Sequence, residues 1–217
     1  MKFYVVLTAI FCSAVTCVAG EERILSTSPN KQIVIVEKRS DGGEIDYYFI
    51  ERSSRKKLGF VLPQEQRHQI SNVAVVASWN KSSANVALVV FYGTKLSELL
   101  LFRRTGDGLF HDVPLNEPDP IALYNEKTGK TLPQPGDGGS ENAVGPWLDD
   151  HTVALITGEA KQTEQLDQYL HLFVTFHARI TNTRAQLSHI ELVGPLSNAK
   201  SERFLKRWGE QYVEAHE

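Results

Sequence analysis

Residues 169–193 (YLHLFVTFHARITNTRAQLSHIELV) contain two runs in which apolar and polar side chains alternate, separated by the polar segment 181–184. Alternation with a period of two predicts β-strands, and a short polar segment between two such runs predicts a hairpin. The side chains of the first run that share its apolar face, and are expected in the core, are Leu170, Leu172, Val174, Phe176, Ala178 and Ile180. The opposite face is expected to be solvated.

The turn also predicts the register of this hairpin. It places Val174 opposite Leu192 and Phe176 opposite Ile190 on the core face. On the other face, the same register brings His177 next to His189.

The chain before this hairpin is a succession of short apolar runs separated by turn residues. Residues 32–38, 45–51 and 56–62 are runs of this kind, and glycines in the segment 41–43 suit a turn. No helical periodicity interrupts the series, so the pattern predicts an all-β, antiparallel fold.

A weak repeat of about fifty residues accompanies these runs. Residues 28–31 (SPNK) precede one apolar strand and residues 78–81 (SWNK) precede another, so that Asn30-Lys31 corresponds to Asn80-Lys81. A third copy begins at residues 146–150 and ends with the hairpin. Four-strand units of this length are typical of propeller blades, and three units are too few for an ordinary closed ring. The prediction is therefore a propeller-like or open, incomplete propeller, with a β-sandwich as the alternative.

Residues 116–145 form a loop insertion in the predicted β domain, which spans residues 21–195. Within the insertion, residues 121–124 are expected to pair as a strand with Thr131-Leu132. Residues 133–145 (PQPGDGGSENAVG) are rich in glycine and proline and read as a long loop. Residues 196–217 are expected to form the only substantial helix, capped by Ser197 or Asn198 and packed on the sheets through Phe204 and Trp208.

The N-terminal residues predict where the protein is located. Residues 1–20 carry Lys2, an apolar stretch and small residues before Glu21, the pattern of a cleaved signal peptide. The protein is thus expected to be exported, to a periplasmic or extracellular location. Both cysteines, Cys12 and Cys17, lie in this segment, and the residues before Cys17 do not suit a lipidation signal. The mature domain is expected to hold no disulfide and to depend on its core.

Charge excludes one class of partner. The chain of 217 residues has a formal net charge of −3, and its basic pairs are isolated. Nucleic acid is therefore not an expected partner, and the apolar N-terminal stretch is too short for a transmembrane helix. The expected partner is a protein or a glycan; the sequence leaves the oligomeric state open.

The candidate binding residues are Trp147, Asp149, Asp150 and His151. Two carboxylates and an imidazole beside an aromatic ring suit either ligand binding or acid–base chemistry. The competing interpretation is a polar β-turn before a strand. The sequence has no Gly-x-Ser-x-Gly or His-Glu-x-x-His motif, so no catalytic residue is predicted.

Metal and cofactor sites are not predicted. His177 and His189 with Glu191 have ligand types that suit zinc, but paired histidines on a solvated strand face are usually surface residues. Asp137 and Glu141 lack the spacing of a calcium loop. The sequence thus favours an exported, non-enzymatic binding or interaction module of the cell envelope. The alternatives are a cell-envelope hydrolase that uses Asp149, Asp150 and His151, and a structural or assembly subunit.

Overall fold

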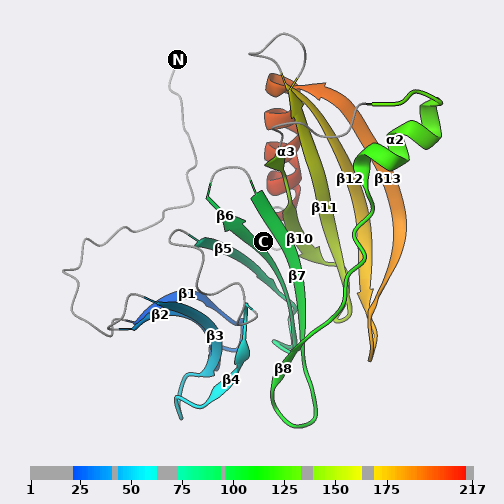
Figure 1. The fold of residues 1–217 in the computed structure, drawn as a ribbon. Coiled ribbons are helices and arrows are strands. Elements are labelled where there is room, and N and C mark those ends of the chain that lie inside the picture. Colours follow the sequence, from blue (N-terminus) through cyan, green and yellow to red (C-terminus); the bar gives the residue numbers. More distant parts are fainter. Residues whose placement is uncertain are drawn as a thin grey trace.

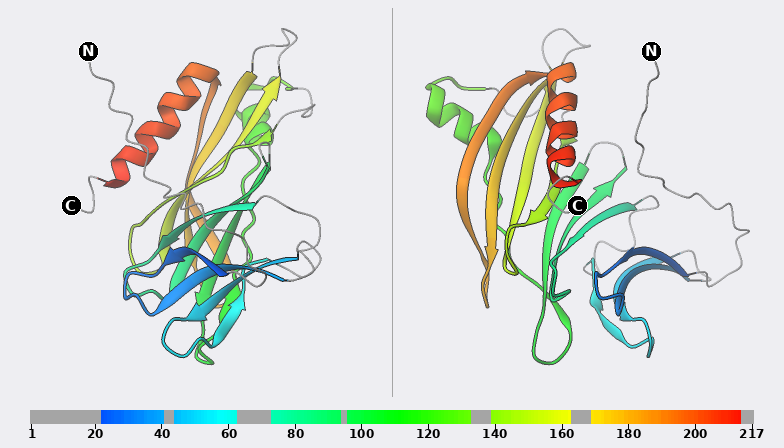
Figure 2. Two further views of the ribbon diagram at one scale, coloured as in Figure 1. Left: turned by 90° about the vertical axis from the view of Figure 1, so that its left-hand side faces the viewer. Right: turned by 180° about the vertical axis from the view of Figure 1, so that it is seen from behind.

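The protein is built from three antiparallel β-sheets that follow one another along the chain and in space (Figure 1). The computed structural model describes residues 22–40, 44–62, 73–93, 96–132, 139–162 and 169–213. The predicted signal peptide and the predicted turn at residues 41–43 lie outside these ranges. The all-β prediction is confirmed, in the open form: the sheets are arranged as a fan, with the second sheet between the other two (Figure 2).

In the first two sheets, each strand pairs with the next strand in sequence. The first sheet contains β1 (Glu22–Thr27), β2 (Ile33–Arg39), β3 (Ile45–Glu51) and β4 (Lys57–Phe60). The second contains β5 (Val73–Trp79), β6 (Asn85–Tyr92), β7 (Leu96–Arg104) and β8 (Phe110–Asp112). The central strands β2 and β6 carry buried apolar residues on both faces. β6 lies in the sheet that has a neighbour on each side, and the face of β2 turned away from the second sheet buries Val34 and Val36 together with Tyr48 and Ile50.

The third sheet is larger and ends in the predicted hairpin. It contains β9 (Gly139–Ser140), β10 (Ala143–Trp147), β11 (Thr152–Gln162), β12 (Tyr169–Ile180) and β13 (Ala185–Ser197). β9 and β10 occupy part of the segment 133–145 that was predicted to be a loop, so that prediction is wrong for residues 139–140 and 143–145. Residues 133–138 lie outside the described ranges.

Two apolar cores hold the three sheets together. The core between the first and second sheets is centred on Phe49, whose ring stacks on Phe110 at 4.4 Å and contacts Trp79 edge-on at 6.1 Å. The core between the second and third sheets contains Val174 and Phe176, both with no exposed surface. The apolar face predicted for the first strand of the hairpin is therefore confirmed as core, except at its end, where Leu170 is 36% exposed.

The predicted register of the hairpin holds only in its middle, from the pair Phe173–Val193 to the pair Thr175–Glu191. Val174 pairs with Leu192, as expected. A bulge then shifts the pairing by one residue, and His177 lies opposite Ser188. Consequently Ile190 is not the partner of Phe176 and is 45% exposed.

A nine-residue helix stands where a strand pair was predicted. α2 (Pro120–Thr128) begins after Asp119, whose carboxylate accepts hydrogen bonds from the backbone N–H groups of Ile121 and Ala122. It ends at Gly129, which has a φ of 66°. An acidic N-cap, a proline in the first turn and a C-terminal glycine are all helix signals. The predicted pairing of residues 121–124 with residues 131–132 is wrong, and so is the expectation of a single substantial helix.

α3 (Asn198–Val213) is the predicted C-terminal helix. It lies on the side of the third sheet opposite α2 (Figure 1), and Phe204 packs on Phe173 with a centroid distance of 5.1 Å. This contact buries a face that was predicted to be solvated: Phe173 is fully buried and His171 is only 7% exposed. Within the described residues, no helix combines the length and the apolar character that a membrane span requires.

Candidate functional site

The turns that lead into β2 and β6 share one backbone geometry. In the first, the N–H of Ser28 donates to the carbonyl of Ile33 at 2.9 Å; in the second, the N–H of Asn80 donates to the carbonyl of Asn85 at 3.0 Å. In both turns the side chain of the opening residue accepts a hydrogen bond from the N–H of the closing residue. Ser28 and Asn80 therefore hold equivalent positions.

Positive φ angles confirm this equivalence of the two turns. Lys31 has a φ of 60° and Ser83 a φ of 62°. Their N–H groups donate to the carbonyls of Ser28 and Asn80, respectively, at 2.9 and 3.0 Å. The predicted correspondence of Asn30-Lys31 with Asn80-Lys81 is thus wrong: Lys31 corresponds to Ser83.

These two turns are bonded to each other, and the second is also bonded to the turn at residues 148–152, which leads into β11. The N–H of Asn30 donates to Ser83 Oγ at 3.2 Å, which joins the first sheet to the second. The amide groups of Asn80 and Asn85 both donate to the carbonyl of Asp150, at 2.8 and 2.7 Å, which joins the second sheet to the third. Both asparagines are buried, so these bonds satisfy donors that water cannot reach.

Two tryptophans, at the ends of β5 and β10, also connect neighbouring sheets. Trp79 ends β5 and donates its indole N–H to Ser26 Oγ in the first sheet at 2.9 Å. Trp147 ends β10 and donates its indole N–H to the carbonyl of Ser78 in the second sheet at 3.0 Å. Each tryptophan therefore holds the sheet that precedes its own, and we call this contact the tryptophan latch.

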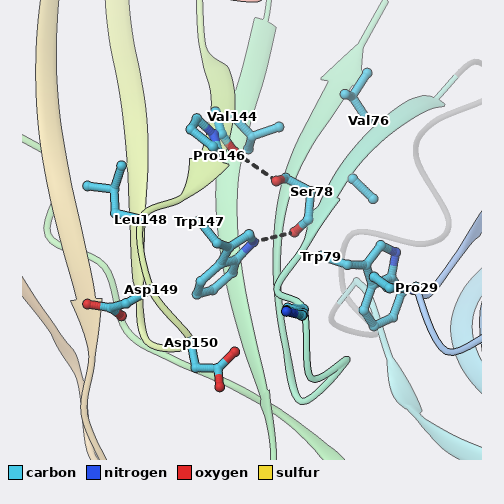
Figure 3. Close-up of a pocket in the computed structure, with 13 residues that line it drawn as sticks. Pro29, Val76, Ser78, Trp79, Val144, Pro146, Trp147, Leu148, Asp149 and Asp150 are labelled. Atoms are coloured by element: carbon cyan, nitrogen blue, oxygen red, sulfur yellow. Dashed lines mark hydrogen bonds between the residues drawn. The ribbon is translucent and has the colours of Figure 1, made fainter. Parts of the chain in front are cut away.

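A groove of about 900 Å³ lies between β5 and β10, at their turn ends (Figure 3). It is hereafter called the tryptophan groove. It is lined by Pro29, Val76, Ala77, Ser78, Trp79, Lys81, Val144, Gly145, Pro146, Trp147, Leu148, Asp149 and Asp150. Its volume is within the range of roughly 300–1,000 Å³ that is typical of small-ligand sites.

The apolar part of the lining is accessible. Val76 is 50% exposed and Leu148 is 51% exposed, although both are large apolar side chains. Because each latch already uses an indole N–H, Trp79 and Trp147 offer a ligand their ring surfaces rather than a donor. Fixed rings lose little conformational entropy when a ligand covers them.

Asp149 maintains the turn in which it lies. Its carboxylate accepts the N–H groups of His151 and Thr152, both at 2.7 Å, and the hydroxyl of Thr152 at 3.0 Å. The bond from the His151 N–H is the main cause that lowers the pKa of Asp149 below its ordinary value of 3.8. This carboxylate therefore stays ionised near neutral pH and is unsuited to donate a proton.

The other predicted site residues separate into two groups. Asp150 lines the groove beside Trp147 (Figure 3). This residue is exposed, and its backbone carbonyl accepts the hydrogen bonds from Asn80 and Asn85. His151 is exposed but does not line the groove. The turn interpretation of residues 149–151 is confirmed by the bond from the Leu148 N–H to the Thr152 carbonyl, at 2.7 Å.

The histidines predicted to meet across the hairpin do so. The rings of His177 and His189 have centroids 4.5 Å apart, and burial, followed by the neighbouring His189, lowers the pKa of His177. His189 has a φ of 53°, which the bulge imposes. Among the described residues no three His, Cys, Asp or Glu side chains are grouped to hold a metal ion.

A buried histidine was not predicted as a structural residue. His171 Nδ1 lies 2.8 Å from Glu141 Oε2, and its Nε2 lies 3.1 Å from Asn198 Oδ1, so it joins the start of α3 to the segment before β10. Glu141, considered above as a calcium ligand, is occupied by this contact; Asp137 lies outside the described residues.

Trp79 and Lys81 also line the groove, and sequence reasoning did not select them. The signal was the tryptophan at the end of the strand: Ser78-Trp79 occupies the strand position of Pro146-Trp147, and each tryptophan ends an edge strand of its sheet. Comparison of the chain with known protein families, with curated proteins and with solved structures finds no match.

Proposed function

We propose that the protein is an exported binding module of the cell envelope that takes a protein or glycan ligand in the tryptophan groove. The observation that carries the proposal is the accessible apolar lining: Val76 and Leu148 are half-exposed beside two tryptophans whose donors are already used. Concave sites with aromatic surface and a few polar groups are the usual form of binding sites. Export is part of the proposal because of the signal-like segment at residues 1–20.

The polar end of the groove supports binding more than hydrolysis. Asp149 is committed to its own turn, and its lowered pKa disfavours the protonated form that a general acid needs. His151 donates its backbone N–H to Asp149 and does not line the groove, so the three residues of the hydrolase alternative are not directed at one point.

The test uses the three tryptophans as reporters, since two of them line the groove. The exported protein is titrated with peptidoglycan fragments and lipopolysaccharide, and is used to select binders from a phage-displayed random peptide library. We expect at least one of these ligand classes to bind and to change the tryptophan fluorescence. Leu148→Glu should abolish that binding, because it places a charge in the apolar lining.

The matched control is Leu96→Glu. Leu96 is 58% exposed, close to the 51% of Leu148, but it lies on β7 outside the groove. Both variants should fold, and only Leu148→Glu should lose binding. If no ligand of either class binds, or if every ligand binds Leu148→Glu as well as wild type, the proposal is wrong.

A further inference from the structure

The outer edges of the three sheets carry devices that prevent another strand from pairing with them. β4 has four residues, with Lys57 at its start, and β8 has three. β13 is interrupted by two register shifts and contains Pro195. Short, charged, bulged or proline-containing edges are the common protections against edge pairing.

The opposite edges of the three sheets, here called the inner edges, are β1, β5 and β10. β1 and β10 are protected in the same way as the outer edges. β1 carries the charged pair Glu22-Arg23 and a register shift between Ile24 and Ser26. β10 contains Pro146 and a register shift of its own.

β5 is the exception. Its sequence, VAVVASW, has no charge and no proline, and its seven residues pair with β6 in one unbroken register, from Val73–Tyr92 to Trp79–Val86. In the part of the chain that the structure describes, no strand other than β6 pairs with it. An apolar, regular edge of this length is a template for an additional strand.

The turn hydrogen bond shows which backbone groups of β5 face the open side. The backbone N–H of Asn80 donates to the carbonyl of Asn85, and this pair continues the register of β5 with β6. Asn80 and Asn85 are therefore a hydrogen-bonded pair of that ladder. In an antiparallel pair, bonded and non-bonded positions alternate, so Ser78 and Val76 direct their backbone groups to β6. The N–H and C=O groups of Val75 and Ala77 therefore face away from β6, and Ala77 lies in the lining of the tryptophan groove.

We propose that the open edge of β5 binds one extended peptide segment of a partner protein, by strand addition inside the tryptophan groove. The inference rests on the proposed function and specifies its ligand. Backbone groups of Val75 and Ala77 supply the hydrogen bonds. Side chains of the added strand alternate between the side of the third sheet, where Leu148 and Trp147 lie, and the side of the first sheet, where Pro29 lies.

Charge and enclosure define the segment further. The groove is flanked by β1 and β10, whose tryptophan latches hold them beside β5, so a single chain has access while the flat face of another sheet does not. At the turn end, two carboxylates, Asp149 and Asp150, oppose one cation, Lys81. The fitting segment is therefore apolar where it pairs with β5 and carries Lys or Arg next to Asp150.

The experiment begins with peptides enriched on the exported protein from a phage-displayed random library and then resynthesised. Each is N-methylated at one position at a time, which removes one backbone donor. Strand addition predicts a period of two: methylation at alternate residues weakens binding by about tenfold per lost bond, and methylation at the residues between them has little effect.

Protein variants give an independent measurement. Ala77→Pro removes an N–H that faces the groove and leaves the pairing of β5 with β6 intact, so it should fold and bind at least about tenfold more weakly. The control is Leu96→Glu, which lies outside the groove and should bind as wild type does. Asp150→Asn should weaken the binding of enriched peptides that carry Lys or Arg, most strongly at low salt.

Failure of this inference is distinguishable from failure of the proposed function. If Leu148→Glu abolishes the binding of a glycan or peptide, but N-methylation has no period of two and Ala77→Pro binds normally, the groove binds by another mode and strand addition is wrong. If Leu148→Glu affects no ligand, both proposals fail. A period of two together with loss of binding in Ala77→Pro supports strand addition.

Discussion

Replacement of Phe176 by alanine is expected to remove a large part of the stability of the protein. Phe176 has no exposed surface and lies in the core between the second and third sheets. Truncation of a buried Phe costs about 3–5 kcal/mol, through the lost transfer free energy and the cavity that remains. β12 is paired on both sides, with β11 and β13, so the backbone cannot move into the cavity and we expect the upper part of this range.

The assay is urea unfolding of the mature protein, followed by circular dichroism. A loss of this size compares with a total free energy of unfolding of about 5–15 kcal/mol. The matched control is Ile190→Ala: the sequence paired Ile190 with Phe176, but the bulge leaves Ile190 45% exposed, so the change should stay within about 0.5 kcal/mol. A loss below about 1 kcal/mol for Phe176→Ala, or equal losses for the two variants, would refute this account of the core.

Three further changes test the structure elsewhere. Ser26→Ala removes the acceptor of one tryptophan latch and should lower the free energy of unfolding by about 0.5–1.5 kcal/mol in the same urea assay. Gly158→Ala should destabilise the third sheet, because the added Cβ would lie 2.4 Å from the ring of Phe173; loss of the cooperative thermal transition or a lowered Tm would show this, and an unchanged Tm would contradict it. Burial raises the pKa of Glu117 above its ordinary value of 4.5. The contribution of this carboxyl group to the free energy of unfolding is therefore fully present below pH 4.5 and is lost as the pH rises through the raised pKa. Glu117→Gln should thus gain stability relative to wild type as the pH is raised from 4 to 7, and a constant difference between the two proteins over this range would contradict the argument.

The sequence predicted the strands well because their signals are local. Alternation in the segment 169–193 identified the hairpin. The register was less accurate: next to the turn Ile180 pairs with Ala185, one residue away from the predicted pairing, and the bulge then brings Val174 opposite Leu192. The bulge that displaces Ile190 depends on the backbone of His189, whose φ of 53° has no marker in a non-glycine residue.

α2 was missed although its end signals are visible. Asp119, Pro120 and Gly129 are typical of helix ends, but of its residues only Pro120 and Ile121 are buried, so the helix has no apolar stripe. A search based on periodicity alone cannot detect such a helix. The burial of His171 was missed for a different reason: it depends on α3, which is distant in sequence and returns to cover the third sheet.

Only one wall of the tryptophan groove was predicted from the sequence. Trp147, Asp149, Asp150 and His151 were selected from the polarity of their turn, and the first three of them line the groove. The opposite wall, which includes Val76 and Trp79, belongs to a strand that reads as ordinary core. What makes that strand a candidate binding edge is the absence of charge and proline, which is visible only in comparison with the other edges.

The tryptophan latch explains why the groove is open. The latch needs a tryptophan at the end of β5 or of the strand in the same position of another sheet, and in the second sheet Ser78 precedes that position as Ser26 does in the first. The first sheet has Thr27 where the tryptophan would stand, so it has no ring to reach back to an earlier sheet. The third sheet has Pro146 where the serine would stand, and α3 covers its outer face. Among the described residues, the series of three sheets therefore does not close into a ring. A closed ring would bury the inner edges around a central channel, whereas this fan leaves the edge of β5 open to a ligand.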